Sequence, residues 1–253
     1  MANFDDQVAV ITGAGSGIGK EIARKLGLEG AHVYLLDSDE FALNESCDEF
    51  KALHISYEKF IVETTNEFDL AKVFNVIKES YGKVDILVNN DETISYELLY
   101  KMNIDDWKHL TNVHLKGVFL CSKYAQELMV DNSYGRIINL SLASAMENDG
   151  QANYTITKAG IQWFTKKFAL ELGQYNITVN TVILGFIETE MTKSIAEKSG
   201  VNYEQLKEEK RSQIPVKRVG LPKDAAHAVC FFASKQASFI SGQVLYVAGG
   251  PKM

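Results

Sequence analysis

The chain has 253 residues, of which 46% are hydrophobic and 23% charged, a composition that fits one soluble domain with a large core. Its 26 Lys and Arg residues against 33 Asp and Glu give a formal net charge of −7, and the cations are dispersed. That balance excludes the basic stripe that neutralises a nucleic-acid backbone. No apolar run is long enough to span a bilayer, and the first residues lack a secretory pattern. We therefore expect a cytoplasmic protein without nucleic-acid or membrane partners.

The three cysteines, Cys47, Cys121 and Cys230, are widely separated and lie in helix-like patterns. Their odd number and their spacing fit neither a disulfide framework nor a zinc site. We expect reduced thiols in the core and no bound metal.

Short β-branched runs alternate with longer stretches of helical period, a pattern typical of strand-helix-strand units and a parallel sheet. The expected strands cover Gln7 to Thr12, His32 to Asp37, Lys59 to Glu63, Val84 to Asn89, Arg136 to Ser141, Thr178 to Ile183 and Val244 to Val247. The expected helices cover Ile18 to Leu28, Glu40 to Ala52, Leu70 to Tyr81, Ile104 to Val130, Asn153 to Tyr175 and Lys223 to Ser234. This order predicts a single doubly wound, Rossmann-like α/β domain over residues 1–253, with about seven parallel strands and helices on both faces.

A charged helical stretch, Glu190 to Gln213, lies between the last two expected strands. Met191, Ile195 and Leu206 give it a moderately apolar face, so we expect a lid over a substrate site. Such a face favours a small hydrophobic carbonyl or an acyl thioester as substrate. The alternative is an exposed helical hairpin whose charges face water.

A glycine-rich turn follows the first expected strand. The segment Thr12 to Gly19 contains Gly13, Gly15, Gly17 and Gly19 and leads directly into a helical run. Glycines tolerate positive φ and let the backbone approach a pyrophosphate, while the following helix offers unpaired N–H groups and a positive dipole end. Strand, turn and helix in this order predict dinucleotide binding. The alternative is a turn that only joins strand to helix.

An acidic residue, Asp37, closes the second expected strand. A carboxylate at this place accepts both adenosine ribose hydroxyls and repels a 2′-phosphate. No Arg or Lys precedes Gly17 or follows Asp37 immediately, so the sequence predicts NAD rather than NADP. The alternative use of Asp37 is to cap the helix that begins near Glu40.

A tyrosine and a lysine lie four residues apart, at Tyr154 and Lys158, on an expected helix. This spacing places the phenol and the ammonium on the same face. A free phenol titrates near pH 10, so a phenolate at neutral pH needs roughly 4 kcal/mol of stabilisation, much of which a nearby ammonium supplies. Ser141 ends the fifth expected strand, at the edge where open parallel sheets bind ligands, and its hydroxyl is placed to hold a substrate oxygen. Without the glycine turn, Tyr154 and Lys158 would be an ordinary helix surface.

These residues carry a family resemblance. The segments concerned are Thr12 to Gly19, Asp37, Asn89 with Asn90, Ser141 thirteen residues before Tyr154, Tyr154 to Lys158, and Gly185 to Thr189. Jointly and in this order they resemble the short-chain dehydrogenase/reductase family, over about Gln7 to Gly250. Within it, Gly150 to Tyr154 resembles 3-oxoacyl-carrier-protein reductases, and the insertion after Thr189 resembles NAD-dependent secondary-alcohol dehydrogenases.

The resemblance implies hydride transfer between nicotinamide and a carbonyl or secondary alcohol. It implies that Tyr154 exchanges the proton, that Lys158 lowers the pKa of the phenol and binds the nicotinamide ribose, and that Ser141 positions the carbonyl. The cofactor residues that it implies are Gly13, Ser16, Gly17, Ile18 and Gly19 at the pyrophosphate, Asp37 and Asn89 on the adenosine side, Ile187 and Thr189 at the nicotinamide amide, and Tyr154 with Lys158. It also implies a homotetramer built partly from the helices at Ile104 to Val130 and Asn153 to Tyr175.

The sequence departs from the family pattern at several places, among them Leu184 before Gly185 and Ala248 before the final glycines, and three departures carry charge or can titrate. Asp91 and Glu92 stand after the twin asparagines where the family usually has alanine and glycine, and His114 stands at the place of a catalytic asparagine. Two carboxylates near cofactor phosphates repel them, unless the side chains turn into water or a pKa shift neutralises them. His114 has either a role near a bound water or a role in the core or a cap. An impaired family member that serves as a binding or assembly protein is therefore the alternative to an active enzyme.

Overall fold

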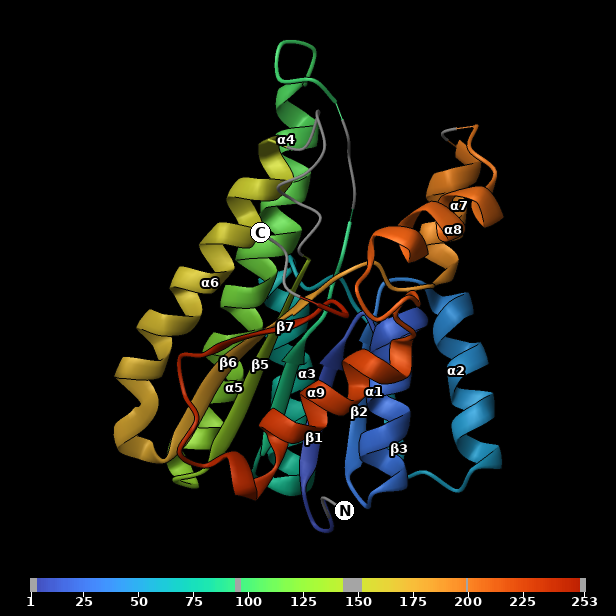
Figure 1. Cartoon of the computed structure of the whole chain (residues 1–253). Helices are drawn as coiled ribbons and strands as arrows, with labels where there is room; N and C mark the ends of the chain where they lie inside the picture. Colours follow the sequence, from blue (N-terminus) through green and yellow to red (C-terminus); the bar gives the residue numbers. More distant parts are fainter. Residues whose placement is uncertain (1–3, 94–96, 143–151, 199, 251–253) are drawn as a thin grey trace.

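The computed structural model describes residues 4–93, 97–142, 152–198 and 200–250. Its seven strands pair in parallel in one sheet of order β3-β2-β1-β4-β5-β6-β7 (Figure 1). The strands are β1 (Val8–Thr12), β2 (His32–Asp37), β3 (Tyr57–Ile61), β4 (Ile86–Asn89), β5 (Gly135–Leu142), β6 (Ile177–Leu184) and β7 (Val244–Val247). The predicted Rossmann-like α/β fold is thereby confirmed.

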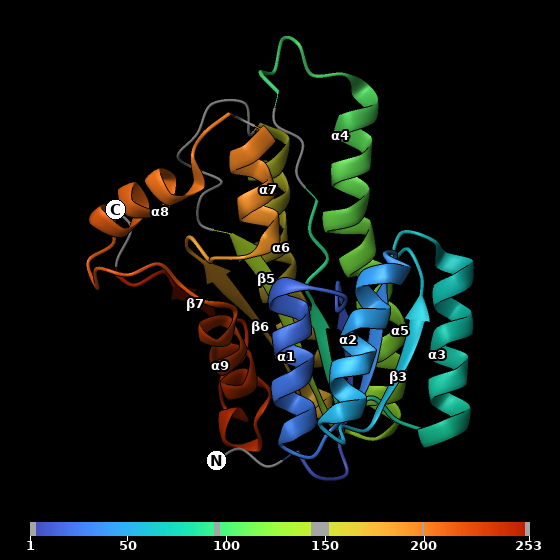
Figure 2. The same cartoon turned by 90° about the vertical axis from the view of Figure 1, so that its right-hand side faces the viewer.

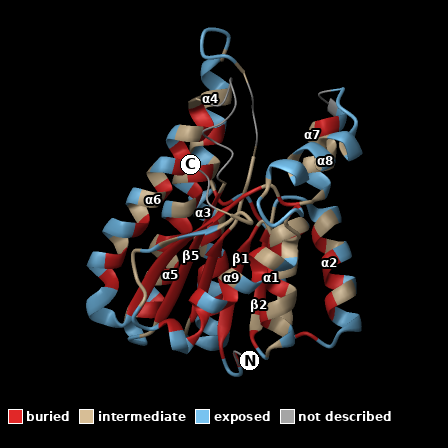
Figure 3. Ribbon diagram, viewed as in Figure 1, coloured by how far each residue is buried: buried red, intermediate tan, exposed pale blue. Residues whose placement is uncertain are grey.

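Strand residues alternate between two hydrophobic clusters, one on each face of the sheet. In β1, Ala9 and Ile11 join one cluster, while Val8 and Val10 join the other. Helices α1 (Gly17–Leu28), α2 (Glu40–Ala52) and α9 (Pro222–Ala233) cover the first face. Helices α3 (Glu67–Tyr81), α5 (Val118–Asp131) and α6 (Ala152–Leu172) cover the second. Because both faces are covered, the central strands are buried almost throughout, as Figure 3 shows.

Short polar side chains begin several of these helices. Asp39 accepts a hydrogen bond from the backbone N–H of Ala42 at the start of α2, and Asn66 caps α3 in the same way. At the other end of α3, Gly82 adopts a left-handed conformation with φ 65° and stops the helix. Asp37 is therefore not the cap of α2, which removes the structural alternative for that carboxylate.

Most expected elements begin or end a few residues away from the limits in the structure, and two of these differences bear on the fold. The helix expected over Ile104 to Val130 is divided into α4 (Ile104–Thr111), a π-helical segment η1 (Asn112–Gly117) and α5. Strand β3 begins and ends two residues before the expected range, because Tyr57 pairs with Val33 of β2. Hydrophobic spacing shows neither an extra residue in one helical turn nor the register of an edge strand.

Three helices stand above the carboxyl ends of the strands. Helix α4 rises on one side of this edge, and α7 (Glu190–Lys198) and α8 (Tyr203–Gln213) rise on the other (Figures 1 and 2). The strand order reverses between β1 and β4, which is the place where doubly wound sheets bind ligands. The remaining short elements are the 3-10 turns η3 (Gly173–Tyr175) and η4 (Lys235–Ala237). Residues 150 and 151 of the reductase-like segment, and Ser199 of the expected lid, lie outside the described residues.

Three further features bear on the expectations from the sequence: the cysteines, membrane-spanning helices and metal ligands. All three cysteines are buried free thiols. No helix in the described part of the chain is long and apolar enough to cross a membrane. Among the same residues, no group of His, Cys, Asp and Glu side chains is arranged to hold a metal ion.

Candidate active site

A pocket of about 930 Å³ opens at the carboxyl edge of the sheet, between the glycine turn and the helices α7 and α8. This volume lies at the upper end of the range for small-molecule and cofactor sites. Eight of the predicted site residues line it, namely Gly13, Ser16, Gly17, Ile18, Asp37, Ser141, Ile187 and Thr189. The sequence motifs thus converge on one cavity, although they come from four parts of the chain.

The glycine turn has the geometry of an anion cradle. Gly13 and Gly17 adopt φ of 60° and 53°, which a residue with a side chain rarely does. A Cβ at Gly13 would lie 2.8 Å from Nδ2 of Asn90, and one at Gly19 would lie 2.0 Å from the carbonyl oxygen of Gly13. Helix α1 begins here without a side-chain cap from Ser16 in the described structure, so its first N–H groups are available to a pyrophosphate.

Asp37 lies beside this turn. Its Oδ2 accepts the backbone N–H of Gly15 at 2.7 Å, and its Oδ1 accepts the backbone N–H of Asp39 at 3.0 Å. These bonds fix the carboxylate at the pocket wall and leave further lone pairs for ribose hydroxyls. Among the described lining residues, Lys210 of α8 is the one Lys or Arg side chain.

The two asparagines after β4 point in different directions. Asn89 is 4% exposed, and its Nδ2 donates to Oδ1 of Asn139 at 2.8 Å within the sheet. Asn90 reaches the glycine turn, where its Nδ2 donates to the carbonyl oxygens of Thr12 and Gly13, both at 3.1 Å. Asn90 lines the pocket, and Asn89 is not among the described lining residues. The family resemblance implied Asn89 as the cofactor contact, but the structure places Asn90 at the pocket wall instead, because Asn89, the last residue of β4, bonds within the sheet.

Asp91 is partly buried beside the turn. The Thr64 hydroxyl donates to its carboxylate, and its backbone N–H donates to Oγ1 of Thr12 at 3.1 Å. Burial raises the pKa of Asp91 to about 6, against the bond from Thr64, which lowers it, and Asp37 raises it further. A pKa of about 6 leaves Asp91 mostly ionised at pH 7, so the shift relieves only part of its repulsion of a phosphate.

Glu92 instead turns inward, toward the predicted catalytic lysine. Its Oε2 lies 2.6 Å from Nζ of Lys158, and its Oε1 lies 3.0 Å from Nε2 of His114. The Lys158 side chain is 3% exposed and that of Glu92 18%. Sequence reasoning singled out Glu92 as a departure but missed this contact, because its two partners come from α6 and from η1.

His114 connects this ion pair to α6. Its Nδ1 lies 3.1 Å from Oγ1 of Thr157, which donates to the carbonyl oxygen of Tyr154 at 2.8 Å. Burial and the neighbouring Lys158 lower the pKa of His114, although Glu92 raises it. Burial opposes the charged form of Glu92, but Lys158 and His114 outweigh it and lower the pKa of Glu92 to about 2.

Tyr154 and Lys158 share the inner face of α6. Nζ of Lys158 lies 5.0 Å from the centre of the Tyr154 ring, which packs edge-on against His114 at 5.4 Å between centroids. The ring also packs beside Leu142, the residue after Ser141. Oγ of Ser141 is buried, lines the pocket and has no hydrogen-bond partner among the described residues. Tyr154 and Lys158 themselves do not belong to the described lining, and Glu92 lies in front of the lysine.

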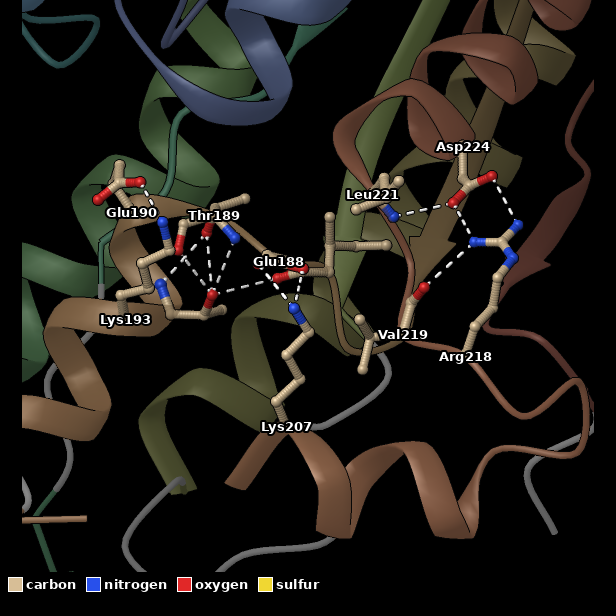
Figure 4. Close-up of polar contacts among 11 residues, drawn as sticks. Glu188, Thr189, Glu190, Lys193, Lys207, Arg218, Val219, Leu221 and Asp224 are labelled. Carbon is tan, nitrogen blue, oxygen red and sulfur yellow. Dashed lines mark hydrogen bonds and ion pairs between the residues drawn. The ribbon is translucent and has the colours of Figure 1, made fainter. Parts of the chain in front are cut away.

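Ion pairs fix the far side of the pocket (Figure 4). Lys207 of α8 lies 2.8 Å from Oε2 of Glu188, which follows β6. Arg218 lies 2.6 Å from Oδ2 of Asp224 at the start of α9. The first contact attaches α8 to the segment after β6, and the second attaches the loop after α8 to α9. Ile195, Leu206 and Ile214 add apolar lining to the pocket.

Known proteins resemble this chain over nearly its whole length. Residues 13–252 match the family model described as enoyl-(acyl carrier protein) reductase. The chain is 36% identical to the 3-oxoacyl-(acyl-carrier-protein) reductase of Thermotoga maritima and 38% identical to that of Vibrio cholerae, each over 98% or more of both chains. It superposes with a TM-score of 0.90 and 27% identity on YwfH, described as an NADPH-dependent reductase involved in bacilysin biosynthesis, over 96% of this chain and 97% of that one.

The chain belongs to the short-chain dehydrogenase/reductase family. It is accordingly an oxidoreductase that acts on CH–OH groups. The family resemblance predicted from its motifs is confirmed, and the glycine cradle and the orphaned Ser141 hydroxyl fit a nicotinamide dinucleotide and a substrate oxygen.

Proposed function

We propose that this short-chain dehydrogenase/reductase interconverts a carbonyl and a secondary alcohol with NAD(H), using Tyr154 as general acid and base. Two observations carry the proposal. Tyr154 and Lys158 lie together in the first turns of α6, with Nζ 5.0 Å from the ring centre, and Leu142 at the end of β5 packs against the same small cluster as Tyr154. Ser141, the residue before Leu142, lines the pocket that begins at the glycine cradle. The bound nicotinamide supplies or takes up the hydride.

Each of the three catalytic side chains has a separate task. Tyr154 gives its phenolic proton to the carbonyl oxygen during reduction and takes it back during alcohol oxidation. Ser141, whose hydroxyl lacks a partner in the described structure, donates a hydrogen bond to the same oxygen. Lys158 stabilises the phenolate that remains and binds ribose hydroxyls. Ile187 and Thr189 meet the nicotinamide amide.

Asp37 supports NAD over NADP. A 2′-phosphate next to this carboxylate would also approach Asp39, a second acidic residue of the pocket lining. The described lining residues near Asp37 include no Lys or Arg that could neutralise the phosphate. One structural neighbour is named as NADPH-dependent, so similarity alone does not favour NAD. The proposal of NAD therefore rests on Asp37 and the residues around it.

The substrate proposed is a hydrophobic carbonyl or an acyl thioester. Apolar side chains of α7 and α8, including Met191, Ile195 and Leu206, line the same pocket as Ser141. The two curated relatives are named for reduction of a 3-oxoacyl group on a carrier protein, which is such a thioester. In this proposal residues 190–213 are the lid.

We also propose a cytoplasmic homotetramer that uses α5 and α6. Both helices present large apolar side chains to solvent in the single chain, among them Phe119, Trp163 and Leu170, which are 50%, 71% and 80% exposed. An impaired binding protein is the less favoured candidate, because the cradle, the pocket and all three catalytic side chains are present.

Paired kinetics test the proposal. The protein is offered ketones and 3-oxoacyl thioesters with NADH or NADPH, and secondary alcohols with NAD, and nicotinamide absorbance is followed. We expect turnover of at least one hydrophobic carbonyl, with higher kcat/KM for NADH than for NADPH. Preference for NADPH would remove the role given to Asp37, and the lack of any turnover would remove the proposal.

A further inference from the structure

The salt bridge between Glu92 and Lys158 is buried and specific. The two side chains approach to 2.6 Å and are 18% and 3% exposed, and no second carboxylate pairs with Lys158 in the described part of the chain. A buried ammonium that loses its partner is strongly destabilised, so the contact persists until another group replaces the carboxylate. Lys158 is thus not free in this state, although the proposed function gives it two tasks.

The contact changes the charge that the phenol experiences. The groups that face the pair are Glu92 and Asp91 from the loop after β4, His114 from η1, and Tyr154 and Lys158 from α6. His114 is held toward its neutral form, since burial and Lys158 lower its pKa. The ion pair as a whole is neutral, because Glu92 cancels the charge of Lys158 at a distance where Coulomb interactions in a protein are strong.

We propose that Glu92 is a positioning residue that restrains Lys158, so that the ammonium supports the Tyr154 phenolate with only part of its charge and binds cofactor ribose only in competition with the carboxylate. This inference rests on the proposed function and deepens it. The family pattern has a small residue at this position, so the restraint belongs to the sequence of this chain.

The sign of the effect follows from the charges. Phenolate is the base in alcohol oxidation, and a positive neighbour favours it at lower pH. Removal of the negative Glu92 leaves Lys158 uncompensated and therefore moves the onset of oxidation to lower pH. The same removal frees donors for ribose hydroxyls and takes a negative charge away from the cofactor, so affinity for NADH increases.

The test compares Glu92→Gln with the wild type and with Glu67→Gln. Glu67 lies 2.9 Å from Lys123 in an exposed pair between α3 and α5. Glu67→Gln therefore also removes one Glu–Lys pair, but outside the pocket, and serves as the matched control. For Glu92→Gln we expect the rising limb of kcat/KM for alcohol oxidation to move down by about one pH unit or more, and the Kd for NADH to fall several-fold. Glu67→Gln leaves both unchanged.

Folding of the variant is checked by circular dichroism, and Glu92→Gly, which restores the small residue of the family pattern, replaces it where glutamine unfolds the protein. An unshifted pH limb or an unchanged NADH affinity in the folded variant overturns the inference. If the wild type binds NADH but turns over no carbonyl, the proposed function fails while the affinity comparison still decides the role of Glu92.

Discussion

Asp91 lies next to the glycine turn with a pKa raised to about 6, because burial and Asp37 disfavour its charge. A raised pKa means that the folded state prefers the protonated carboxyl. Its contribution to stability is therefore present at acid pH and is lost as the pH rises from about 4 through about 6.

Asp91→Asn is expected to stabilise the protein above pH 6. The amide keeps an acceptor for the Thr64 hydroxyl and carries no charge, so the free energy of unfolding at pH 8 should rise by about 1 to 2 kcal/mol. The gain should shrink toward zero at about pH 3.5, where Asp91 is protonated in both the folded and the unfolded state. Urea unfolding at the two pH values measures it, with Asp48→Asn on the exposed face of α2 as the control. An equal gain at both pH values would contradict the pKa assigned to Asp91.

Eight of the residues predicted for the site line one pocket, because short motifs encode their positions locally. The cradle, Asp37, Ser141, Tyr154 and Lys158 follow from a turn, two strand ends and a helical spacing. The orientation of Glu92 could not be predicted, since its partner is 66 residues away and meets it only in the folded chain. The position of Asn90 at the pocket could not be predicted either, because the direction of its side chain depends on where β4 ends.

Helices α7 and α8 are the elements proposed as a lid, and the ion pair of Lys207 with Glu188 attaches α8 to the sheet edge. Its two side chains are 31% and 25% exposed, so solvent screens the pair and its contribution to stability is small. Such a contact is suited to an element that opens and closes.

Lys207→Gln is expected to loosen α8 selectively. Hydrogen exchange in residues 203–213 should become about two- to threefold faster while exchange in the sheet is unchanged, and KM should rise by a similar factor. Arg211→Gln breaks a pair with Glu208 inside α8 and is the control. Equal effects of the two variants would show that the cross-element contact has no special role.

Elements were predictable where a hydrophobic period continues over many residues. All seven strands and the helices that cover the sheet were expected, because alternation and a 3.6-residue period both record which face is buried. The division of one expected helix by η1 was not expected, because the apolar residues continue in α4 before the π-helical segment and in α5 after it. That turn contains His114, so the site depends on a feature that periodicity does not show.

At the scale of the whole molecule, the order of strands and helices determined the fold because parallel crossovers admit few arrangements. The assembly of several chains depends instead on which apolar side chains remain on the surface of each chain. Phe119, Trp163 and Leu170 on α5 and α6 form the face proposed for assembly.

Light scattering should give a mass four times the 28.2 kDa of the chain. Trp163→Glu should lower this mass, because a carboxylate would be buried in an apolar interface. Phe41→Glu on α2 is the control, since Phe41 is 73% exposed on another face. A monomeric wild type, or equal masses for the two variants, would contradict an assembly through α5 and α6.

The central claim is that Tyr154 moves the proton in a dinucleotide-dependent reaction, and Tyr154→Phe tests it most directly. The variant should bind NADH with an affinity close to that of the wild type, measured by calorimetry, and should lose carbonyl reduction by about a thousandfold. Tyr175→Phe, in the η3 turn that follows α6, should retain both properties. Unchanged turnover in Tyr154→Phe, with NADH binding intact, would contradict the account.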